Sequence, residues 1–261
     1  MTRTRVKIFG ERNTATNALK ALIETNSAAR VLPSISSEID PGVLERLRLV
    51  RASCPAADPV IHQHAREAEI DKVFAGQPPS HAWKHTATVF DQIASLDDAL
   101  VLFCVRHPLS WLLALYRSPY HLQGPRARSF PRFVAAEWRL TQRDNLPCTA
   151  LLPHALYEAK LRSYQACIVQ LEAAGIPYQV LRFEDIVLRQ EAVFAGMAVQ
   201  LEDPAVQCTP VARSTKDKAK DLGHYIDYYG AERWREEIAD AIPAITGQLA
   251  WDLFAAFGYE A

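Results

Sequence analysis

Residues 6–22, VKIFGERNTATNALKAL, form the segment that most constrains how this chain can fold. A short apolar run is followed by small polar residues and then by helical spacing of apolar residues, which predicts a strand, a loop and a helix. Gly10 permits a tight turn at the end of the strand. The first turn of a helix offers free backbone N–H groups and a dipole that favours negative charge, so this unit is expected to hold an anion.

Side chains of the loop add further donors for an anion. Thr14, Thr16 and Asn17 supply hydroxyl and amide groups, and Arg12 supplies a fixed positive charge. The spacing is similar to that of a P-loop but lacks its lysine, because that motif would need glycine at Ala15 and lysine at Thr16. An NTPase is therefore disfavoured. The alternative is that Thr14 or Thr16 only caps a core helix.

Composition limits the classes of protein to which the chain can belong. Its 261 residues, 49% of them apolar, can bury the core of one large domain over residues 1–261. With 29 basic and 30 acidic residues the formal net charge is −1. No overall field therefore attracts nucleic acid or an anionic membrane, and any anion site must be local.

Cysteine usage and hydropathy indicate the compartment. The five cysteines are widely separated and show no metal-ligand spacing, which favours reduced thiols and no bound metal. The first residues, MTRTRVKIFG, lack the apolar core of a signal peptide, and no run approaches the roughly 18 apolar residues of a membrane span. We therefore expect a cytoplasmic protein without a membrane span. The cysteines are Cys54, Cys104, Cys148, Cys167 and Cys208.

Residues 100–105, LVLFCV, are continuously apolar, which predicts an interior strand of a parallel sheet covered on both faces. The strand ends at Arg106, and a helix is predicted over residues 110–117 with Ser110 as its N-cap. As in the first unit, a strand carries charge to the start of a helix. Ligands of such sheets bind at the carboxyl ends of the strands, so Arg106 is expected near the loop after the first strand.

A shorter strand is predicted at residues 81–85, whose end would carry Lys84 and His85 to the same edge of the sheet. A neutral imidazole there can act as a base, and an ammonium group can neutralise developing negative charge. The alternatives are an ordinary polar residue at a strand end for His85 and a solvated charge for Lys84.

The rest of the chain alternates between helical and strand-like segments, which predicts an α/β fold with a mostly parallel sheet. Prolines and serines indicate a loop-rich insertion near residues 31–80, and SPYHLQGPRARSFP at residues 118–131 indicates a mobile loop beside the site. Helices are predicted over residues 43–52, 61–74, 133–143, 154–174 and 184–201, and a strand over residues 178–183.

Three segments resemble the sulfotransferases that use 3′-phosphoadenosine 5′-phosphosulfate (PAPS), and they fall in the order of that family. They are GERNTATNAL, VLFCVRHPLSWLLALYR and VLRFEDIV, and the ending LAWDLFAAFGYE is similar to the close of many carbohydrate-directed members. The resemblance covers the chain loosely from end to end. It implies a three-layer sandwich with a P-loop-like phosphosulfate-binding loop, PAPS as donor, adenosine 3′,5′-bisphosphate (PAP) as product, and no metal.

The resemblance also implies residue roles. His85 would act as the general base, Lys84 would neutralise the sulfuryl oxygens, and Arg12 would serve the leaving phosphate. Arg106 and Ser110 would hold the 3′-phosphate. The remaining donor-binding residues would be Gly10, Asn13, Thr14, Ala15, Thr16 and Asn17 in the first loop, with Arg213 and Lys216 in a late basic segment.

The chain departs from the family pattern at three positions. Ala15 stands where the family has glycine, and the basic residue of the loop falls on Asn13, with Arg12 displaced by one position. Ala114 stands where a serine is expected after the 3′-phosphate arginine, which leaves Ser110 as a differently placed hydroxyl.

The expected function is transfer of a sulfuryl group to a hydroxyl or amine of a small molecule, lipid or saccharide. Whether Lys84 or His85 is the main catalytic group is left open, as is the oligomeric state. One alternative is a non-catalytic nucleotide-binding or scaffold protein, which the departures at Asn13, Ala15 and Ala114 favour. A nucleotide or nucleoside kinase is a further alternative, which the missing P-loop lysine disfavours.

Overall fold

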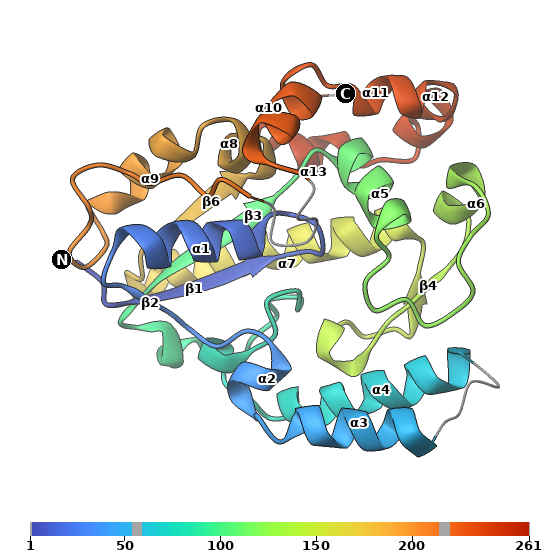
Figure 1. The fold of residues 1–261 in the computed structure, drawn as a ribbon, viewed down its shortest axis with the longest axis horizontal. Helices are drawn as coiled ribbons and strands as arrows, with labels where there is room; N and C mark the ends of the chain where they lie inside the picture. Colours follow the sequence, from blue (N-terminus) through green and yellow to red (C-terminus); the bar gives the residue numbers. More distant parts are fainter. Residues whose placement is uncertain (1, 54–58, 214–219, 261) are drawn as a thin grey trace.

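The fold, described for residues 2–53, 59–213 and 220–260 in a computed structural model, is built around a parallel β-sheet (Figure 1). Its strands lie in the order β2-β1-β3-β6, and every neighbouring pair is parallel. This arrangement confirms the α/β class expected from the alternating segments. The strands are β1 (Arg5–Gly10), β2 (Arg30–Val31), β3 (Ala99–Val105) and β6 (Tyr178–Arg182).

Helices cover both faces of the sheet, which is compatible with a three-layer sandwich (Figure 1). All seven residues of β3 are buried, as its unbroken apolar sequence requires. Because side chains alternate along a strand, Leu100 and Leu102 join one core cluster, whereas Val101 and Phe103 join the other. The strand is thus an interior strand, as predicted.

The first core lies beneath α1 (Thr16–Asn26) and α9 (Gln190–Ala198). Helix α1 buries Leu19, Leu22 and Ile23 against the sheet, with spacing typical of one apolar helix face. Residues 6–22 therefore form the predicted strand, loop and helix.

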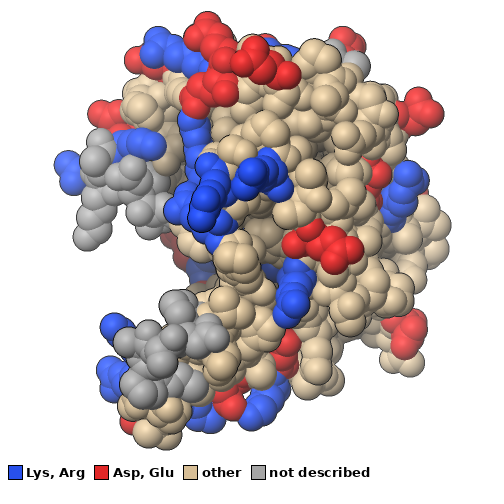
Figure 2. Space-filling model, turned by 90° about the vertical axis from the view of Figure 1, so that its right-hand side faces the viewer, with Lys and Arg blue, Asp and Glu red and all other residues tan. Residues whose placement is uncertain are grey.

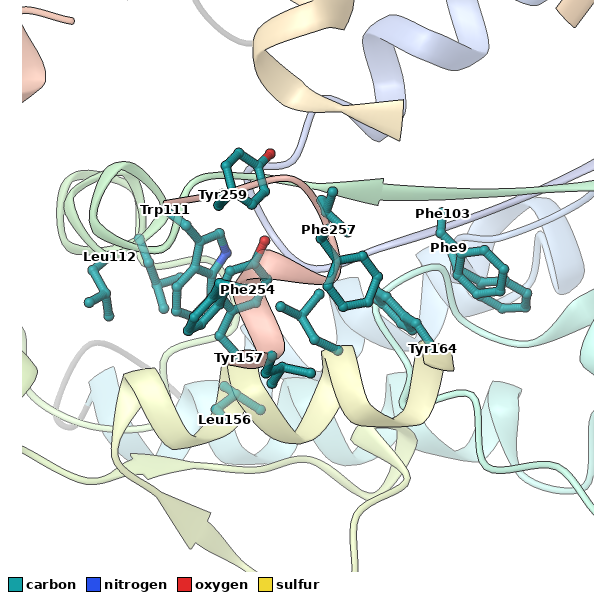
Figure 3. Packing of buried hydrophobic residues seen from close by; sticks show 14 of the residues in the cluster. Phe9, Phe103, Trp111, Leu112, Leu156, Tyr157, Tyr164, Phe254, Phe257 and Tyr259 are labelled. Atoms are coloured by element: carbon teal, nitrogen blue, oxygen red, sulfur yellow. The ribbon is translucent and has the colours of Figure 1, made fainter. Parts of the chain in front are cut away.

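The second core lies between the sheet, α5 (Pro108–Arg117) and α7 (Pro153–Ala174). Figure 3 shows its aromatic packing: Phe9 stacks on Phe103 with ring centroids 5.9 Å apart, and Trp111 stacks on Tyr157 at 4.4 Å. The predicted helix over residues 154–174 is confirmed, and Gly175 ends it in the left-handed conformation.

Residues 31–80 contain more helix than the loop-rich insertion expected there, and both helices predicted in this segment, over residues 43–52 and 61–74, are confirmed. These residues contain α2 (Ser36–Ile39), α3 (Val43–Ser53) and α4 (Pro59–Phe74), which lie below the sheet in Figure 1. These helices share a small core of their own, in which Val43 and Ile70 pack with Trp83.

The strand predicted at residues 81–85 is absent from the structure. A short turn of 3-10 helix, η1 (Pro79–His81), is followed by irregular backbone, and Lys84 meets β1 only where its carbonyl accepts a hydrogen bond from the Gly10 N–H at 2.8 Å. The fully buried Lys7 explains the difference, because its Nζ donates to the carbonyls of Ser80 and Ala82 at 3.1 and 2.7 Å. A side chain thus holds this segment where a strand ladder was expected.

Two predicted helices are also shorter or interrupted. Instead of one helix over residues 133–143, α6 (Phe130–Val134) precedes a two-residue strand β4 (Trp138–Arg139) that pairs with β5 (Ala150–Leu151). The segment 184–201 is divided at Arg189 into α8 (Phe183–Leu188) and α9, because Arg189 leaves the helical conformation.

The C-terminal part covers the carboxyl ends of the strands (Figure 1). No helix of the described residues is long and apolar enough to cross a bilayer. The remaining elements are η2 (Ala94–Leu96), η3 (Gln142–Asp144), α10 (Leu222–Gly230), α11 (Trp234–Glu237), η4 (Ala239–Ala241), α12 (Ile242–Thr246) and α13 (Trp251–Ala255).

Candidate active site

A cavity of about 670 Å³ opens where β1 and β3 end. The chain continues from β1 to β2 on one side and returns with β3 on the other, so this edge is the point at which the strand order reverses. Parallel sheets bind their ligands at such points. Figure 2 shows Lys and Arg side chains gathered beside the hollow between the upper and lower parts of the molecule.

The cavity wall is basic although the whole chain is close to neutral. Among the described residues that line it, seven are Lys or Arg and none is Asp or Glu. Arg12, Arg66 and Arg117 are paired with carboxylates behind the wall. The local field that would attract an anionic ligand is therefore expected around Lys84 and Arg106 rather than over the whole wall. The basic residues are Arg12, Arg66, Lys84, Arg106, Arg117, Arg213 and Lys220.

The start of α1 forms one end of this wall. Asn13 and Ala15 adopt the left-handed conformation with φ of 65° and 67°, and this turns the chain into the helix without a side-chain cap. Thr16 and Asn17, in the first turn, line the cavity. Uncapped N–H groups at the start of an eleven-residue helix are a suitable donor set for an anion.

Gly10 and Thr14 shape this loop from behind and do not line the cavity. A Cβ on Gly10 would lie 2.6 Å from Thr14 Oγ1 and 2.7 Å from Cys104 Cβ, so glycine is needed there for close packing. The Thr14 hydroxyl donates to the Glu11 carbonyl at 2.7 Å. The tight turn expected at Gly10 is instead made by the two left-handed residues further along.

Arg106 is held at the cavity by a set of contacts from distant parts of the chain. Its Nε and one terminal nitrogen donate to Ser110 Oγ at 2.9 and 2.8 Å, and the other terminal nitrogen donates to the Asn13 carbonyl at 2.9 Å. The guanidinium also lies 3.9 Å from the centre of the Phe183 ring and donates to the Tyr229 hydroxyl at 2.9 Å. Ser110 thus positions Arg106 from inside α5, whose N-cap is His107 rather than the predicted Ser110.

Lys84 and His85, adjacent in the chain, both line the cavity. His85 Nδ1 is 2.5 Å from the Gly10 carbonyl, and since a carbonyl only accepts, Nδ1 carries the hydrogen. Nε2 therefore holds the lone pair of the neutral ring, and within the described residues it makes no hydrogen bond. Burial, with help from the nearby Lys84 and Arg12 charges, keeps the pKa of His85 well below 6.5.

Lys84 joins this position to the start of α1. Its ammonium group donates to Asn17 Oδ1, and burial lowers its pKa to about 8, so it is mostly protonated at pH 7. The two residues lie at the edge of the sheet where the sequence predicts them, although on irregular backbone rather than on a strand.

Arg12 lies in a buried ion cluster, contrary to the direct catalytic role expected of it. Its side chain is fully enclosed, and its terminal nitrogens contact Glu11 at 2.6 Å and Asp144 at 3.3 Å. Lys160 donates to Asp144 Oδ1 at 2.9 Å and to the His85 carbonyl at 2.7 Å. Burial opposes ionisation of Asp144, but the Arg12 and Lys160 charges outweigh it and hold the pKa of this carboxyl well below its usual range. The cluster therefore supports the backbone beneath the cavity.

The late basic segment is only partly described. Arg213 is exposed and lines the cavity, whereas Lys216 lies outside the described residues. The sequence did not predict that Phe183 and Tyr229 contact Arg106 or that Trp83 contacts Arg12. The position of an aromatic residue in the sequence does not indicate which cation it will contact in the fold. Comparison with models of known protein families and with curated protein sequences finds no match to the chain.

Proposed function

We propose that the chain is a PAPS-dependent sulfotransferase that moves a sulfuryl group to a hydroxyl or amine acceptor. In this proposal the α/β fold is a three-layer sandwich whose loop before α1 acts as a P-loop-like phosphosulfate site. The resemblance of three sequence segments to that family supports it.

The observation that carries the proposal is the pairing of two anion sites in one basic cavity. The uncapped start of α1 and the Arg106 guanidinium both face it, and Asn13 connects them through its carbonyl. A donor with phosphate groups at two positions of one nucleotide needs such a pair of sites. The hydrogen-bond donors of the two sites suit this nucleotide, because backbone N–H groups bind phosphates well and a guanidinium group matches phosphate geometry.

PAPS supplies the sulfuryl group when bound. In the transfer a bond forms between the acceptor oxygen and sulfur while the bond between sulfur and the bridging phosphate oxygen breaks, and its electron pair leaves with the phosphate. His85 Nε2 takes the proton of the acceptor, and the Lys84 ammonium neutralises charge on the sulfuryl oxygens. Arg12 acts only through the cluster that holds this segment in place.

Thermal melting with three nucleotides tests the donor site. PAP is expected to stabilise the protein by about 2.7 kcal/mol at a hundred times its dissociation constant. Adenosine 5′-monophosphate, which lacks the 3′-phosphate, and ATP with magnesium should stabilise it much less. Equal shifts with PAP and the monophosphate would rule out a 3′-phosphate site at Arg106.

Transfer of labelled sulfuryl groups from PAPS to candidate acceptors then separates an enzyme from a nucleotide-binding protein. Labelled product that requires His85 supports the enzyme. Tight PAP binding with no transfer to hydroxyl or amine acceptors would support the non-catalytic alternative instead.

A further inference from the structure

The cavity has a second side that differs in chemistry from the anion sites. The segment 35–74 supplies five apolar side chains to the wall, and Trp83 continues this surface toward the catalytic pair. We call these six residues the apolar arm. They are Ile35, Leu44, Leu47, Ile70, Phe74 and Trp83.

The apolar arm leads directly to the expected base. The Phe74 and Trp83 rings lie 6.4 Å apart, and the edge contact between Trp83 and His85 is 5.0 Å between ring centroids. The Trp83 ring is 4% exposed, because the Arg12 and Arg143 guanidinium groups lie over it at 4.8 and 4.5 Å. A ligand lying on the apolar arm therefore meets only the small exposed part of this ring, beside the imidazole whose Nε2 is available to accept a proton. Lys84 Nζ, by contrast, is joined to Asn17 on the α1 side.

Charge on the apolar side is neutralised within the protein. Arg66 lines the cavity here, and the carboxylate of the buried Glu67 lies 2.8 Å from its guanidinium. Glu67 also pairs with Arg143, whose charge is shared with Asp71, so the two arginines are balanced by two carboxylates. An anionic or strongly polar ligand would thus lose its hydration without gaining an uncompensated charge. Leu44, 55% exposed, and Ile35, 38% exposed, are apolar side chains that a ligand could cover.

We infer that the acceptor is a neutral apolar alcohol, aryl or alkyl, bound on the apolar arm with its hydroxyl at His85. This inference rests on the proposed function and selects one acceptor class from those the sequence leaves open. A saccharide would leave many of its hydroxyl groups against Leu44, Leu47 and Phe74 without partners. The reaction is the transfer already given, with the alcohol proton going to His85 Nε2.

Calorimetry with 2-naphthol in the absence of any nucleotide tests the arm by itself. The informative variant is Leu44→Asn, and Leu49→Asn is its matched control: both leucines lie on α3 and are similarly exposed, at 55% and 60%, but only Leu44 lines the cavity. Leu44→Asn should weaken 2-naphthol binding about fivefold, the effect of losing part of one apolar contact, while Leu49→Asn should leave it unchanged.

The same preparations are titrated with N-acetylglucosamine and with PAP. Tighter binding of N-acetylglucosamine than of 2-naphthol to the parent protein would overturn the inference. Equal 2-naphthol affinity in the parent, Leu44→Asn and Leu49→Asn would also overturn it. PAP affinity should be the same in all three, because Leu44 and Leu49 belong to α3 and not to the anion sites. If PAP binds to none of them while the 2-naphthol ranking holds, the apolar site stands and the sulfotransferase proposal fails.

Discussion

Arg106 shows how a single side chain can be prepared for a ligand before the ligand arrives. It is 3% exposed, yet its guanidinium is held in one orientation by Ser110, the Asn13 carbonyl and Tyr229. A fork that is already ordered loses little conformational entropy on binding a phosphate. A substitution at Arg106 should therefore test the fixed orientation of its guanidinium group and not its charge alone.

Arg106→Lys keeps the positive charge and removes the fork. We expect PAP affinity to fall at least about tenfold, because a lysine cannot make the paired contacts of a guanidinium. Calorimetry measures the change, and Arg182→Lys is the control, since Arg182 lies at the end of the neighbouring strand β6 but does not line the cavity. Unchanged PAP affinity in Arg106→Lys would remove Arg106 from the donor site.

His85 is the residue at which binding and chemistry should separate. His85→Gln is expected to lower turnover by about two to four orders of magnitude with little change in PAP affinity, since a base acts in the transition state. Because burial lowers the pKa of His85, the acidic limb of the parent rate profile should lie below pH 6.5 and vanish in the variant. Rate profiles with an active acceptor provide the measurement.

Lys84→Met distinguishes the competing assignment. If Lys84 is the main catalytic group, its loss is the more damaging change and the acidic limb survives in that variant. Near-normal turnover with an unaltered acidic limb in His85→Gln would refute the role of the imidazole.

At the scale of elements, the loop before α1 combines an unusual backbone with an ordinary residue. Ala15 has φ of 67° and ψ of 18°. In this left-handed conformation the Cβ of alanine crowds the backbone, whereas glycine adopts it without strain. The positive φ at this position explains why the sulfotransferase pattern has glycine there. In this chain the alanine is expected to strain the turn.

Ala15→Gly should therefore raise the free energy of unfolding by about 1 kcal/mol, since relief of the left-handed strain exceeds the added freedom of the unfolded chain. The same exchange inside α1, Ala21→Gly, should lower it by about 1 kcal/mol. Urea unfolding of both variants checks the opposite signs. A loss of stability in both would show that the turn is not strained in solution.

The elements that the sequence predicts well are those whose burial gives a continuous or periodic pattern of apolar residues. Residues 100–105 and 154–174 form the expected strand and helix, because continuous or stripe-like apolar patterns follow directly from packing. Residues 81–85 do not form the expected strand, because Lys7 holds their backbone from another part of the chain.

The candidate site is predictable only in part: the sequence indicates which residues reach the edge of the sheet but not which distant residues contact them. Arg106, Lys84 and His85 were expected at one edge of the sheet and do line one cavity. One of the two carboxylate partners of Arg12, however, is Asp144, 132 positions away in the sequence, and no local pattern marks such a pairing. The apolar arm was not predicted either: four of its residues lie in the helices expected over residues 43–52 and 61–74, but no local pattern shows that these helices line a cavity.

For the whole molecule, buried histidines link stability to pH. Burial lowers the pKa values of His85, His107 and His121, so the fold keeps these rings neutral at pH values where the unfolded chain protonates them. The unfolded state then binds more protons, and stability falls as the pH decreases below about 6.5. For His107, whose pKa is lowered to about 4, the loss extends from pH 6.5 to about pH 4.

His107→Phe should remove one part of this dependence, up to about 1.4 kcal/mol for each pH unit between 6.5 and 4. The ring packs among Trp234, Trp251 and Tyr259, which can accept a phenyl group. Urea unfolding at pH 7.5, 6 and 5 measures the slope, and the exposed His224→Phe serves as control. An identical slope in His107→Phe and the parent would contradict the assignment.

The contacts of Arg106 also have a consequence for the time course of biosynthesis. The Asn13 carbonyl is made 93 positions before Arg106, while Tyr229 follows Arg106 by 123 positions. A nascent chain can form β1 and α1 early, but it cannot enclose the guanidinium before residue 229 leaves the ribosome. Occupancy of this pocket can therefore stabilise only a polypeptide that has been translated past Tyr229, and translation pauses before that residue would leave the guanidinium without its Tyr229 contact.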